Sequence, residues 1–521
     1  MGAHALEEMP MTRFEPLHTL PRARDVDDFT DRCDSPREEC GVFGIWAPGE
    51  EVARICFFGL FALQHRGQES AGIAVSTGST LVVKKDMGLV TQVFHEDSIR
   101  DLQGISAIGH TRYSTTGSSV LCNAQPLLST SAVGDIAVAH NGNLVNTTAL
   151  RMELEADGVV FETTNDSEVI AQLLSRLHKG CIEDTVKAVM QRIEGAYSLV
   201  VLTPDRLLGV RDPYGIRPLC IGRMDQGHLV LASESCALGP VGAQYLRELE
   251  PGEIVSIGMD GMKELQGVPT KKHATCLLEF IYFARPDSLI YSKSLHMVRR
   301  RMGQELAREH PCPDAHVVVP IPDTGTPAAL GYSEAARIPF GEGVIKSRYI
   351  QRTFIQPSQK MRDMGARMKY TPLRETLAGR KVVMVDDTIV RGTTTDKLVK
   401  MLFDAGAVEV HVRITAPPVR FPCFYGIDMA SQDELVAAKN SVEEIRKIIG
   451  ATSLGFLSLA GATRAVGLSK DNFCSACFDG KYPIAIPNDV RVTKQMLESA
   501  PTPPASSGQG EELELPLLEP V

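Results

Sequence analysis

Two short stretches of the sequence carry side chains suited to chemistry. The first is Cys40, which stands directly before the apolar run "GVFGIW". A cysteine attacks a substrate as a thiolate, so it needs a group that takes its proton. The second is the pair Asp386 and Asp387, which follows the apolar run "VVMV". Two carboxylates at the end of a buried strand can hold ribose hydroxyls or a hydrated Mg²⁺.

No histidine near Cys40 in the sequence is available as a base. Cleavage of the chain before Cys40 would free its α-amino group. With an ordinary pKa of about 7.7–8.0, that group suits general-base catalysis beside its own thiol. Residues 1–39 are polar and lack sustained periodicity. We therefore expect them to be a disordered leader that masks the base until it is removed.

Three motifs that follow Cys40 carry groups able to bind an amino acid. In "GHTRYST", Arg112 can bind a carboxylate, and in "TTNDSEV", Asp166 can bind an ammonium group. In "AHNGNL", Asn141 and the backbone N–H of Gly142 can donate to a tetrahedral oxyanion. Each motif alone is weak evidence, because Asn-Gly commonly forms a hairpin turn and a cysteine before a strand is commonly just buried.

Asp386 and Asp387 belong to a strand, loop and helix unit over residues 381–402. The loop "TIVRGTTT" offers backbone N–H groups, hydroxyls and a helix N-terminus, which together favour a phosphate. A second loop, "PIPDTGTPAALGY", also follows an apolar run. Clusters of Lys and Arg flank both loops, and in a chain of net charge −10 they favour a polyanionic small ligand over nucleic acid.

The spacing of apolar runs predicts two folded domains with extensions at both ends. Residues 40–275 show short apolar runs between Gly and Asn turns, with some helical patterns, which predicts stacked antiparallel sheets with outer helices. Residues 276–490 alternate strand, loop and helix, which predicts a parallel α/β sheet. Residues 491–521 are rich in Pro, Ser and Glu, so we expect a largely disordered tail.

The composition of the chain indicates where in the cell the protein acts. The chain of 521 residues is 43% hydrophobic and 23% charged, and it has neither an apolar run of membrane-spanning length nor the pattern of a secretory signal. We therefore expect a cytoplasmic protein that does not bind a membrane. The 12 cysteines then argue against a disulfide framework. The C-x-x-C motif of Cys474 and Cys477 reads equally as a redox pair, half of a zinc site or chance.

Taken together, the motifs "CGVFGI", "LQHRGQESAGIA", "GHTRYSTTG", "HNGNL" and "TTNDSEV" resemble the class II glutamine amidotransferases, whose nucleophile is the N-terminal residue. The resemblance implies an α+β N-terminal-nucleophile amidohydrolase domain with Cys40 as nucleophile. It also implies an oxyanion hole of Asn141 and Gly142. Glutamine would be bound by Arg112, Thr115 and Asp166.

The C-terminal half resembles the type I phosphoribosyltransferases, an α/β family that binds phosphoribosyl pyrophosphate (PRPP). This resemblance implies that Asp386 and Asp387 face the ribose and one Mg²⁺ per subunit, with Thr324 near the metal. The remaining PRPP-binding residues that it implies are Lys346, Arg348, Lys369, Thr388, Arg391, Gly392, Thr393, Thr394 and Thr395.

A chain that joins both halves resembles the glutamine PRPP amidotransferases. That family converts glutamine, PRPP and water into 5-phosphoribosylamine, glutamate and pyrophosphate at the start of purine synthesis. The resemblance further implies purine nucleotides as feedback inhibitors and a homo-oligomer, either a dimer or a tetramer. One branch carries a processed leader and a [4Fe–4S] cluster, here expected on Cys276, Cys423, Cys474 and Cys477. Four thiolates suit zinc as well.

Two other functions compete with this one at the level of sequence. The first is an enzyme that makes a different aminated phosphoribosyl or sugar product. The second is a PRPP-sensing transcription factor, which has no need for an ammonia source. We also expect the segment Lys346–Phe354 to close over PRPP, with Tyr349, Ile350 and Phe354 forming the apolar wall of an ammonia passage.

Overall fold

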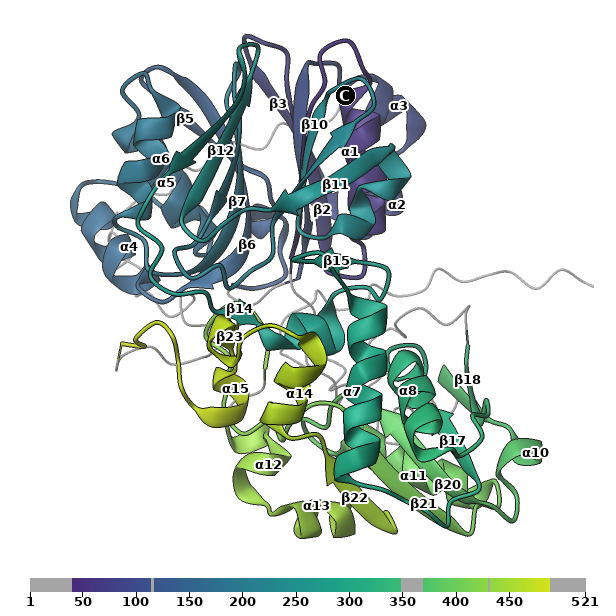
Figure 1. The fold of residues 1–521 in the computed structure, drawn as a ribbon. Helices are drawn as coiled ribbons and strands as arrows, with labels where there is room; N and C mark the ends of the chain where they lie inside the picture. The colour runs from purple at the N-terminus through teal and green to yellow at the C-terminus, as the bar shows by residue number, and fades with distance from the viewer. Residues whose placement is uncertain (1–39, 114–116, 348–368, 430–431, 488–521) are drawn as a thin grey trace, which may run out of the picture.

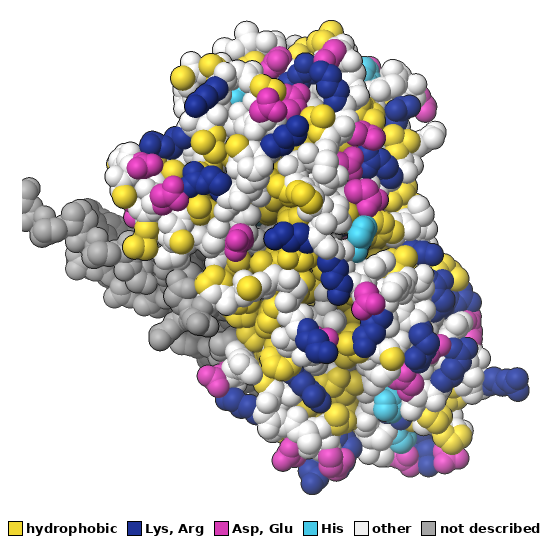
Figure 2. Space-filling view, turned by 60° about the vertical axis from the view of Figure 1, so that its left-hand side comes forward, with side chains coloured by type: hydrophobic (Ala, Val, Ile, Leu, Met, Phe, Trp, Pro, Cys, Tyr) yellow, Lys and Arg dark blue, Asp and Glu magenta, His cyan; other side chains and the backbone are white. Residues whose placement is uncertain are grey.

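The computed structural model describes residues 40–113, 117–347, 369–429 and 432–487. Figure 1 shows two lobes, with the N-terminal half of the chain above and the C-terminal half below. The predicted leader and tail, Thr115, Arg348 and most of the predicted closing segment lie outside the described residues. In Figure 2, basic and acidic side chains are interspersed over the face in view.

The upper lobe is a sandwich of two antiparallel sheets, as the sequence predicts. The seven-stranded sheet has the order β11-β9-β10-β1-β4-β2-β3, and the six-stranded sheet has the order β13-β12-β8-β7-β6-β5. The strands of the first are β1 Gly41–Trp46, β2 Ser70–Ser76, β3 Leu81–Met87, β4 Ser106–Arg112, β9 Cys220–Met224, β10 Leu229–Ala232 and β11 Ala243–Glu248. The strands of the second are β5 Leu127–Ser131, β6 Gly134–Leu144, β7 Gly195–Leu202, β8 Leu207–Arg211, β12 Glu253–Gly258 and β13 Gly261–Gln266.

Helices cover the outer faces of this sandwich (Figure 1). The helix α1 packs on the seven-stranded sheet, and α5 and α6 pack on the six-stranded sheet. The helical segments of this lobe are α1 Val52–Ala62, α2 Val90–Val93, α3 Glu96–Arg100, α4 Thr147–Ala156, α5 Ser167–Leu177 and α6 Ile182–Met190.

Strand β1 lies at the centre of the seven-stranded sheet, and its packing fixes the position of Cys40. Alternate residues of β1 face the two sides of the sheet: Phe43 packs in the core beneath α1, and Val42 packs in the core between the sheets. A Cβ atom at Gly44 would lie 2.7 Å from a methyl carbon of Val200 on the facing sheet. Glycine at this position therefore lets the two sheets approach closely.

The lower lobe contains a parallel sheet of order β17-β20-β21-β22, which confirms the predicted α/β class. Its strands are β17 Val317–Pro320, β20 Lys381–Asp386, β21 Glu409–Ile414 and β22 Ser453–Phe456. The short strands β18 Val344–Lys346 and β19 Tyr370–Pro372 pair beside it. Its α-helices are α7 Leu295–Glu309, α8 Thr326–Ala336, α10 Arg374–Leu377, α11 Thr393–Asp404, α12 Val436–Lys439, α13 Val442–Ile448, α14 Leu459–Val466 and α15 Ala476–Asp479.

The two lobes meet through short elements and a shared core. Strand β14 (Thr275–Cys276) pairs in parallel with β23 (Phe473–Cys474), so the predicted domain boundary falls inside β14. A π-helix over Glu279–Phe283 and the strands β15 (Leu289–Ile290) and β16 (Lys293–Ser294) follow. Val145, Ala196 and Ile216 of the upper lobe belong to the core cluster of the lower lobe. Among the described helices, none combines the length and apolarity needed to cross a membrane.

Close contact between α7 and α8 yields a test of the lower lobe. A Cβ atom at Gly303 of α7 would lie 1.8 Å from the backbone oxygen of Ala328 on α8. Replacement of glycine by alanine in a helix gains about 1 kcal/mol of propensity. We expect the clash to outweigh that gain, because overpacking typically costs about 1–3 kcal/mol and here the obstacle is backbone. Gly303→Ala should therefore lower the free energy of unfolding in urea denaturation.

The matched control is Gly239→Ala. An added Cβ at Gly239 meets no atom within 4 Å, so this variant should unfold like the parent protein. Equal stabilities for the two variants would contradict the packing described for α7 and α8.

Candidate functional site

Cys40 is buried where the chain enters β1. Its Sγ donates a hydrogen bond of 3.3 Å to the carbonyl oxygen of Tyr113. Burial raises the pKa of the Cys40 thiol to about 11. Among the described residues, no imidazole or carboxylate is hydrogen-bonded to this thiol. A buried thiol of this kind needs an added base before it can act as a nucleophile at neutral pH.

Arg112 and Asp166 both act electrostatically on Cys40, so the fold brings these predicted residues together. Arg112 ends β4, which pairs with β1, and its Nη1 donates to the carbonyl oxygen of Ser118 at 3.2 Å. Asp166 precedes α5, and its Oδ2 accepts the backbone N–H of Leu144 at 3.0 Å. A cation and an anion are thus presented to the same small region, as an amino acid ligand requires.

Asn141 and Gly142 lie on β6 rather than in a hairpin turn, and they have the properties of oxyanion donors. The Nδ2 of Asn141 is buried and has no hydrogen-bond partner among the described residues. A buried donor without a partner is costly unless a ligand accepts from it. Gly142 has φ of 147°, and a Cβ there would lie 2.0 Å from the carbonyl oxygen of Ala196. The position therefore requires glycine.

A loop of the lower lobe, residues 424–428, packs against this site. The Nδ2 of Asn143 donates to the carbonyl oxygen of Phe424 at 3.1 Å, and the hydroxyl of Tyr113 donates to the Asp428 carboxylate at 3.4 Å. A Cβ at Gly426 would lie 2.9 Å from the backbone of Gly142. No local motif predicts this contact, because the partners are 281 and 315 residues apart in the chain.

Asp386 and Asp387 occupy the carboxyl end of β20, and the two side chains have different surroundings. Asp386 is partly exposed, whereas Asp387 is buried and accepts hydrogen bonds from the hydroxyls of Thr324 and Thr388. Burial raises the pKa of Asp387, while these hydrogen bonds and the charge of Arg299 act in the opposite direction. Thr324 and Asp387, predicted to share a metal site, are therefore in contact.

The predicted phosphate loop leads into α11. Gly392 has φ of 84° and caps the helix, so the residues Thr393, Thr394 and Thr395 form its first turn. An N-terminal helical turn presents backbone N–H groups and a partial positive charge to an anion. The predicted cation Arg391 is ion-paired at 2.7 Å with Glu434 in this structure.

Two other predicted cations flank the segment outside the described residues. Lys346 ends β18, and its Nζ donates to the Asp323 carboxylate at 2.6 Å. Lys369 precedes β19, and its ammonium lies 5.4 Å from the ring centroid of Tyr370. The backbone N–H of Ser347 bonds to the carbonyl oxygen of Lys369 at 2.9 Å, which holds the two strands together.

The four predicted cluster ligands gather near the junction of the lobes. Cys276 and Cys474 are opposite one another in the β14–β23 pair. Cys423 acts electrostatically on both Cys474 and Cys477, and so does Cys276. Among the described residues, no three of these sulfurs lie within 4.8 Å of one another. Four thiolates on one tetrahedral zinc ion would be about 3.8 Å apart, given Zn–S bonds of about 2.3 Å. The spacing favours a larger group.

Comparison with known proteins shows similarity over nearly the whole chain. The glutamine amidotransferase domain family matches residues 110–240. A protein named amidophosphoribosyltransferase from Synechococcus elongatus is 52% identical over 491 residues, which are 93% of this chain and 99% of that protein. A protein of the same name from Mycobacterium tuberculosis is 47% identical over 477 residues, which are 89% of this chain and 90% of that protein.

Two solved structures share the fold. One, described as the allosteric regulatory enzyme of purine biosynthesis, superposes with a TM-score of 0.84 at 46% identity and covers 88% of this chain and 99% of its own. The other is the glutamine PRPP amidotransferase of B. subtilis complexed with ADP and GMP. It has a TM-score of 0.82 at 46% identity and covers 87% of this chain and 99% of its own.

The raised pKa of Cys40 yields a test of the site. Because only the thiolate is alkylated and the pKa of Cys40 is about 11, the rate of alkylation in the 521-residue chain should rise about tenfold per pH unit. Peptide mass spectrometry after iodoacetamide treatment between about pH 7 and 9.5 measures this rate. The exposed Cys122 reports reagent reactivity in the same sample. A plateau of the Cys40 rate below pH 9 would contradict the described burial.

Proposed function

This chain belongs to the amidophosphoribosyltransferase family, and we propose that it makes 5-phosphoribosylamine from glutamine, PRPP and water, with glutamate and pyrophosphate as the other products. This reaction begins the de novo synthesis of purine nucleotides. One observation carries the proposal: a single chain holds a nucleophile site and a phosphate-loop site, and residues 424–428 of the second lobe contact the first site directly. A PRPP sensor without catalysis would not need the first site.

In the glutamine half, we assign Cys40 as the nucleophile and its own α-amino group, freed by removal of residues 1–39, as the base. The thiolate attacks the side-chain amide carbon, the C–N bond breaks, and ammonia leaves with the proton taken from the thiol. Water then hydrolyses the thioester to glutamate. Asn141 Nδ2 and the N–H of Gly142 stabilise the oxyanion in both steps. Arg112, Thr115 and Asp166 orient the substrate glutamine.

In the PRPP half, ammonia attacks the anomeric carbon, and the bond to pyrophosphate breaks. The first turn of α11 and Thr388 hold the 5′-phosphate, and Asp386 offers its partly exposed carboxylate to the ribose hydroxyls. Asp386, Asp387 and Thr324 are all oxygen donors, which is the ligand type that Mg²⁺ takes. Bound there, the ion would neutralise charge on the pyrophosphate. Lys346, Arg348 and Lys369 add positive charge around it.

Ammonia must reach PRPP before it equilibrates with water, because ammonium is a poor nucleophile. We assign the Lys346–Phe354 segment as the element that closes over PRPP and lines the passage with Tyr349, Ile350 and Phe354. Lys346 stands at the base of this segment, bonded to Asp323 in the loop that also carries Thr324. Closure of such a segment excludes water and completes a site.

We also propose a [4Fe–4S] cluster on Cys276, Cys423, Cys474 and Cys477. Among the described residues no three of these sulfurs lie within 4.8 Å of one another, which supports a cluster over a single zinc ion. The cluster would tie β14, β23 and the 423–428 loop together at the junction, which is a structural task. Purine nucleotides are the feedback inhibitors we expect, and the B. subtilis relative with bound ADP and GMP supports this. A dimer or tetramer in the cytoplasm remains the expected setting.

A matched pair of variants tests the two-site assignment. Cys40→Ala should lower glutamine-dependent activity by at least about a hundredfold but spare synthesis from added ammonium salt, because the acceptor site lies in the other lobe. Asp386→Asn should impair synthesis with both nitrogen donors. Pyrophosphate release measures both activities. The control Asp404→Asn changes an exposed carboxylate at the far end of α11 and should behave like the parent. Equal loss of both activities in Cys40→Ala would refute the assignment.

The cluster yields a separate test. Protein purified without oxygen should be brown and contain about four Fe per chain. Cys474→Ser should lose the colour and part of its stability, because Cys474 stands opposite Cys276 where β14 and β23 join the lobes. A colourless, fully active protein that contains zinc would refute the cluster and leave the four-thiolate site intact.

A further inference from the structure

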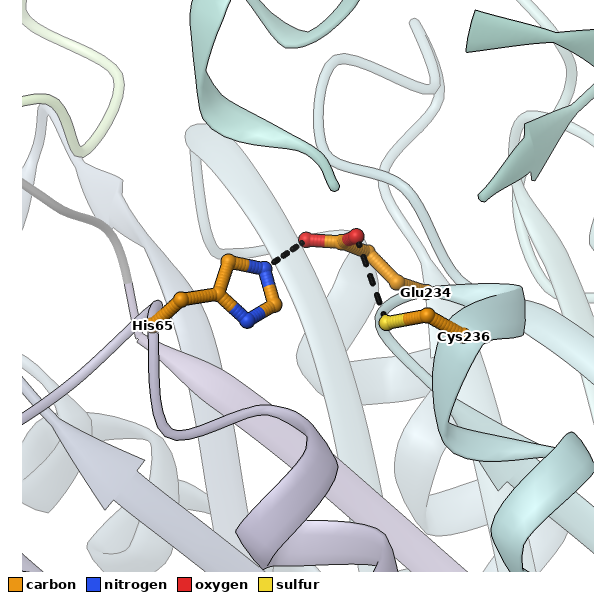
Figure 3. Close-up of side chains that lie close together, drawn as sticks. All are labelled: His65, Glu234 and Cys236. Carbon is orange, nitrogen blue, oxygen red and sulfur yellow. Dashed lines mark hydrogen bonds and ion pairs between the residues drawn. The ribbon is translucent and has the colours of Figure 1, made fainter. Parts of the chain in front are cut away.

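One group of side chains outside the two sites has atoms of the types that bind metal ions. His65, Glu234 and Cys236 place a nitrogen, an oxygen and a sulfur within 4.8 Å of one another (Figure 3), and among the described residues no other such group occurs. Glu234 Oε1, however, already accepts from His65 Nε2 at 2.7 Å and from Arg66 Nη1 at 2.5 Å. A buried guanidinium on the same oxygen repels a divalent cation. The three side chains therefore form part of a hydrogen-bond network rather than a metal site.

The second oxygen of Glu234 faces the other lobe. Its Oε2 accepts the backbone N–H of Arg285 at 2.9 Å and the hydroxyl of Ser288 at 2.8 Å. The Cys236 thiol lies 3.5 Å from the same oxygen. Burial would raise the pKa of Glu234, but the charges of His65 and Arg66 outweigh burial and hold it well below its usual range. Glu234 is thus an anion shared between the two lobes.

Arg66 connects this anion to the nucleophile. Its Nε donates to the carbonyl oxygen of Cys40 at 3.2 Å, and its two Nη atoms donate to Glu279 at 3.1 and 2.8 Å. The side chains of Arg66, Glu234 and Glu279 are all essentially inaccessible to solvent. The guanidinium is therefore fixed on three sides, and one of those sides is the backbone of Cys40.

The turn that binds Glu234 also starts α7. The carbonyl oxygens of Pro286 and Ser288 accept the backbone N–H groups of His296 and Leu295 in the first turn of this helix. Helix α7 runs from the junction into the lower lobe (Figure 1) and carries Arg299. Burial lowers the pKa of Arg299 to about 10, and Asp387 is the strongest charge opposing that shift. Hydrogen bonds therefore continue from Cys40 to the first turn of α7, and Arg299 on that helix acts electrostatically on Asp387 of the acid pair.

We propose that Glu234 is a positioning residue for glutamine hydrolysis: it holds Arg66 against Cys40, and it transmits the position of the 285–288 turn, and thus of α7, to the nucleophile. This inference rests on the proposed function, because it takes Cys40 as the nucleophile and PRPP as the ligand of the lower lobe. It assigns Glu234 no contact with substrate. Loss of its charge should therefore affect how well Cys40 is placed rather than how glutamine binds.

The first experiment compares Glu234→Gln with the parent in two assays. Glutamine-dependent synthesis should lose about tenfold or more in kcat with KM for glutamine little changed, because displacement of a reacting group costs rate rather than binding. Ammonia-dependent synthesis should stay within about twofold. The control is Glu253→Gln, which removes another buried carboxylate, paired at 2.6 Å with Arg247 between β12 and β11, and should leave both activities unchanged.

The second experiment uses Ser288→Ala, which removes one hydrogen bond to Glu234 from the lower lobe and keeps the ion pair with Arg66. Glutaminase activity without PRPP should stay within about twofold of the parent, and the rise caused by PRPP should shrink. Combined with Glu234→Gln, the serine change should add no further loss, because both act through one contact.

Equal losses of glutamine-dependent and ammonia-dependent activity in Glu234→Gln would overturn the inference and reveal a purely structural role. So would a change confined to KM, or an unaltered PRPP response in Ser288→Ala. If Glu234→Gln does not fold, the ratio of glutamine-dependent to ammonia-dependent activity is measured in Glu234→Asp and Ser288→Ala instead. Failure of the parent protein to form phosphoribosylamine from either nitrogen donor would instead refute the proposed function.

Discussion

The rest of the structure depends on one pair of buried ion pairs. The guanidinium of Arg66 lies between the carboxylates of Glu234 and Glu279, where the two lobes meet. A buried charge is tolerated only when it is paired and fully hydrogen-bonded, and removal of one partner typically costs about 3–5 kcal/mol. Arg66 and Glu234 come from the sandwich, and Glu279 begins the π-helix that leads into the lower lobe. Neither lobe can therefore shift without leaving a buried charge unpaired.

This constraint explains why the two sites are held as one unit. Cys40 is bonded to Arg66 through its carbonyl oxygen, and Gly142 and Asn143 are contacted by Gly426 and Phe424 from the other lobe. The glutamine site is thus covered on one side by the 424–428 loop, which belongs to the PRPP half. For a reaction that must carry ammonia from one site to the other without exchange with water, such a cover is a physical requirement rather than an accident of packing.

The sequence was sufficient to predict the class of both lobes, because that feature depends on local patterns, and the site residues that it suggests also lie in short local motifs. Cys40 before an apolar strand, Asn141-Gly142 and Asp386-Asp387 each lie within a short motif; Cys40 and the acid pair lie at strand ends, whereas Asn141 and Gly142 lie within β6. Glu234, Glu279 and the 424–428 loop could not be predicted. Glu234 and Glu279 lie 168 and 213 residues from their partner Arg66, and the loop residue Phe424 lies 281 residues from its partner Asn143. In a sequence, a glutamate that becomes buried cannot be distinguished from one that stays on the surface. Only the folded chain reveals that its charge is balanced.

In the proposed function the two sites act together, and ammonia passes from one to the other inside the molecule. The most direct test supplies glutamine labelled with ¹⁵N in its side-chain amide, saturating PRPP and an excess of unlabelled ammonium salt, and measures the isotope in the phosphoribosylamine after chemical trapping. If nitrogen passes internally, the product formed by the glutamine route keeps the ¹⁵N undiluted once the small ammonia-dependent rate is subtracted. Product whose label matches the mixed ammonia pool of the solution would contradict the account.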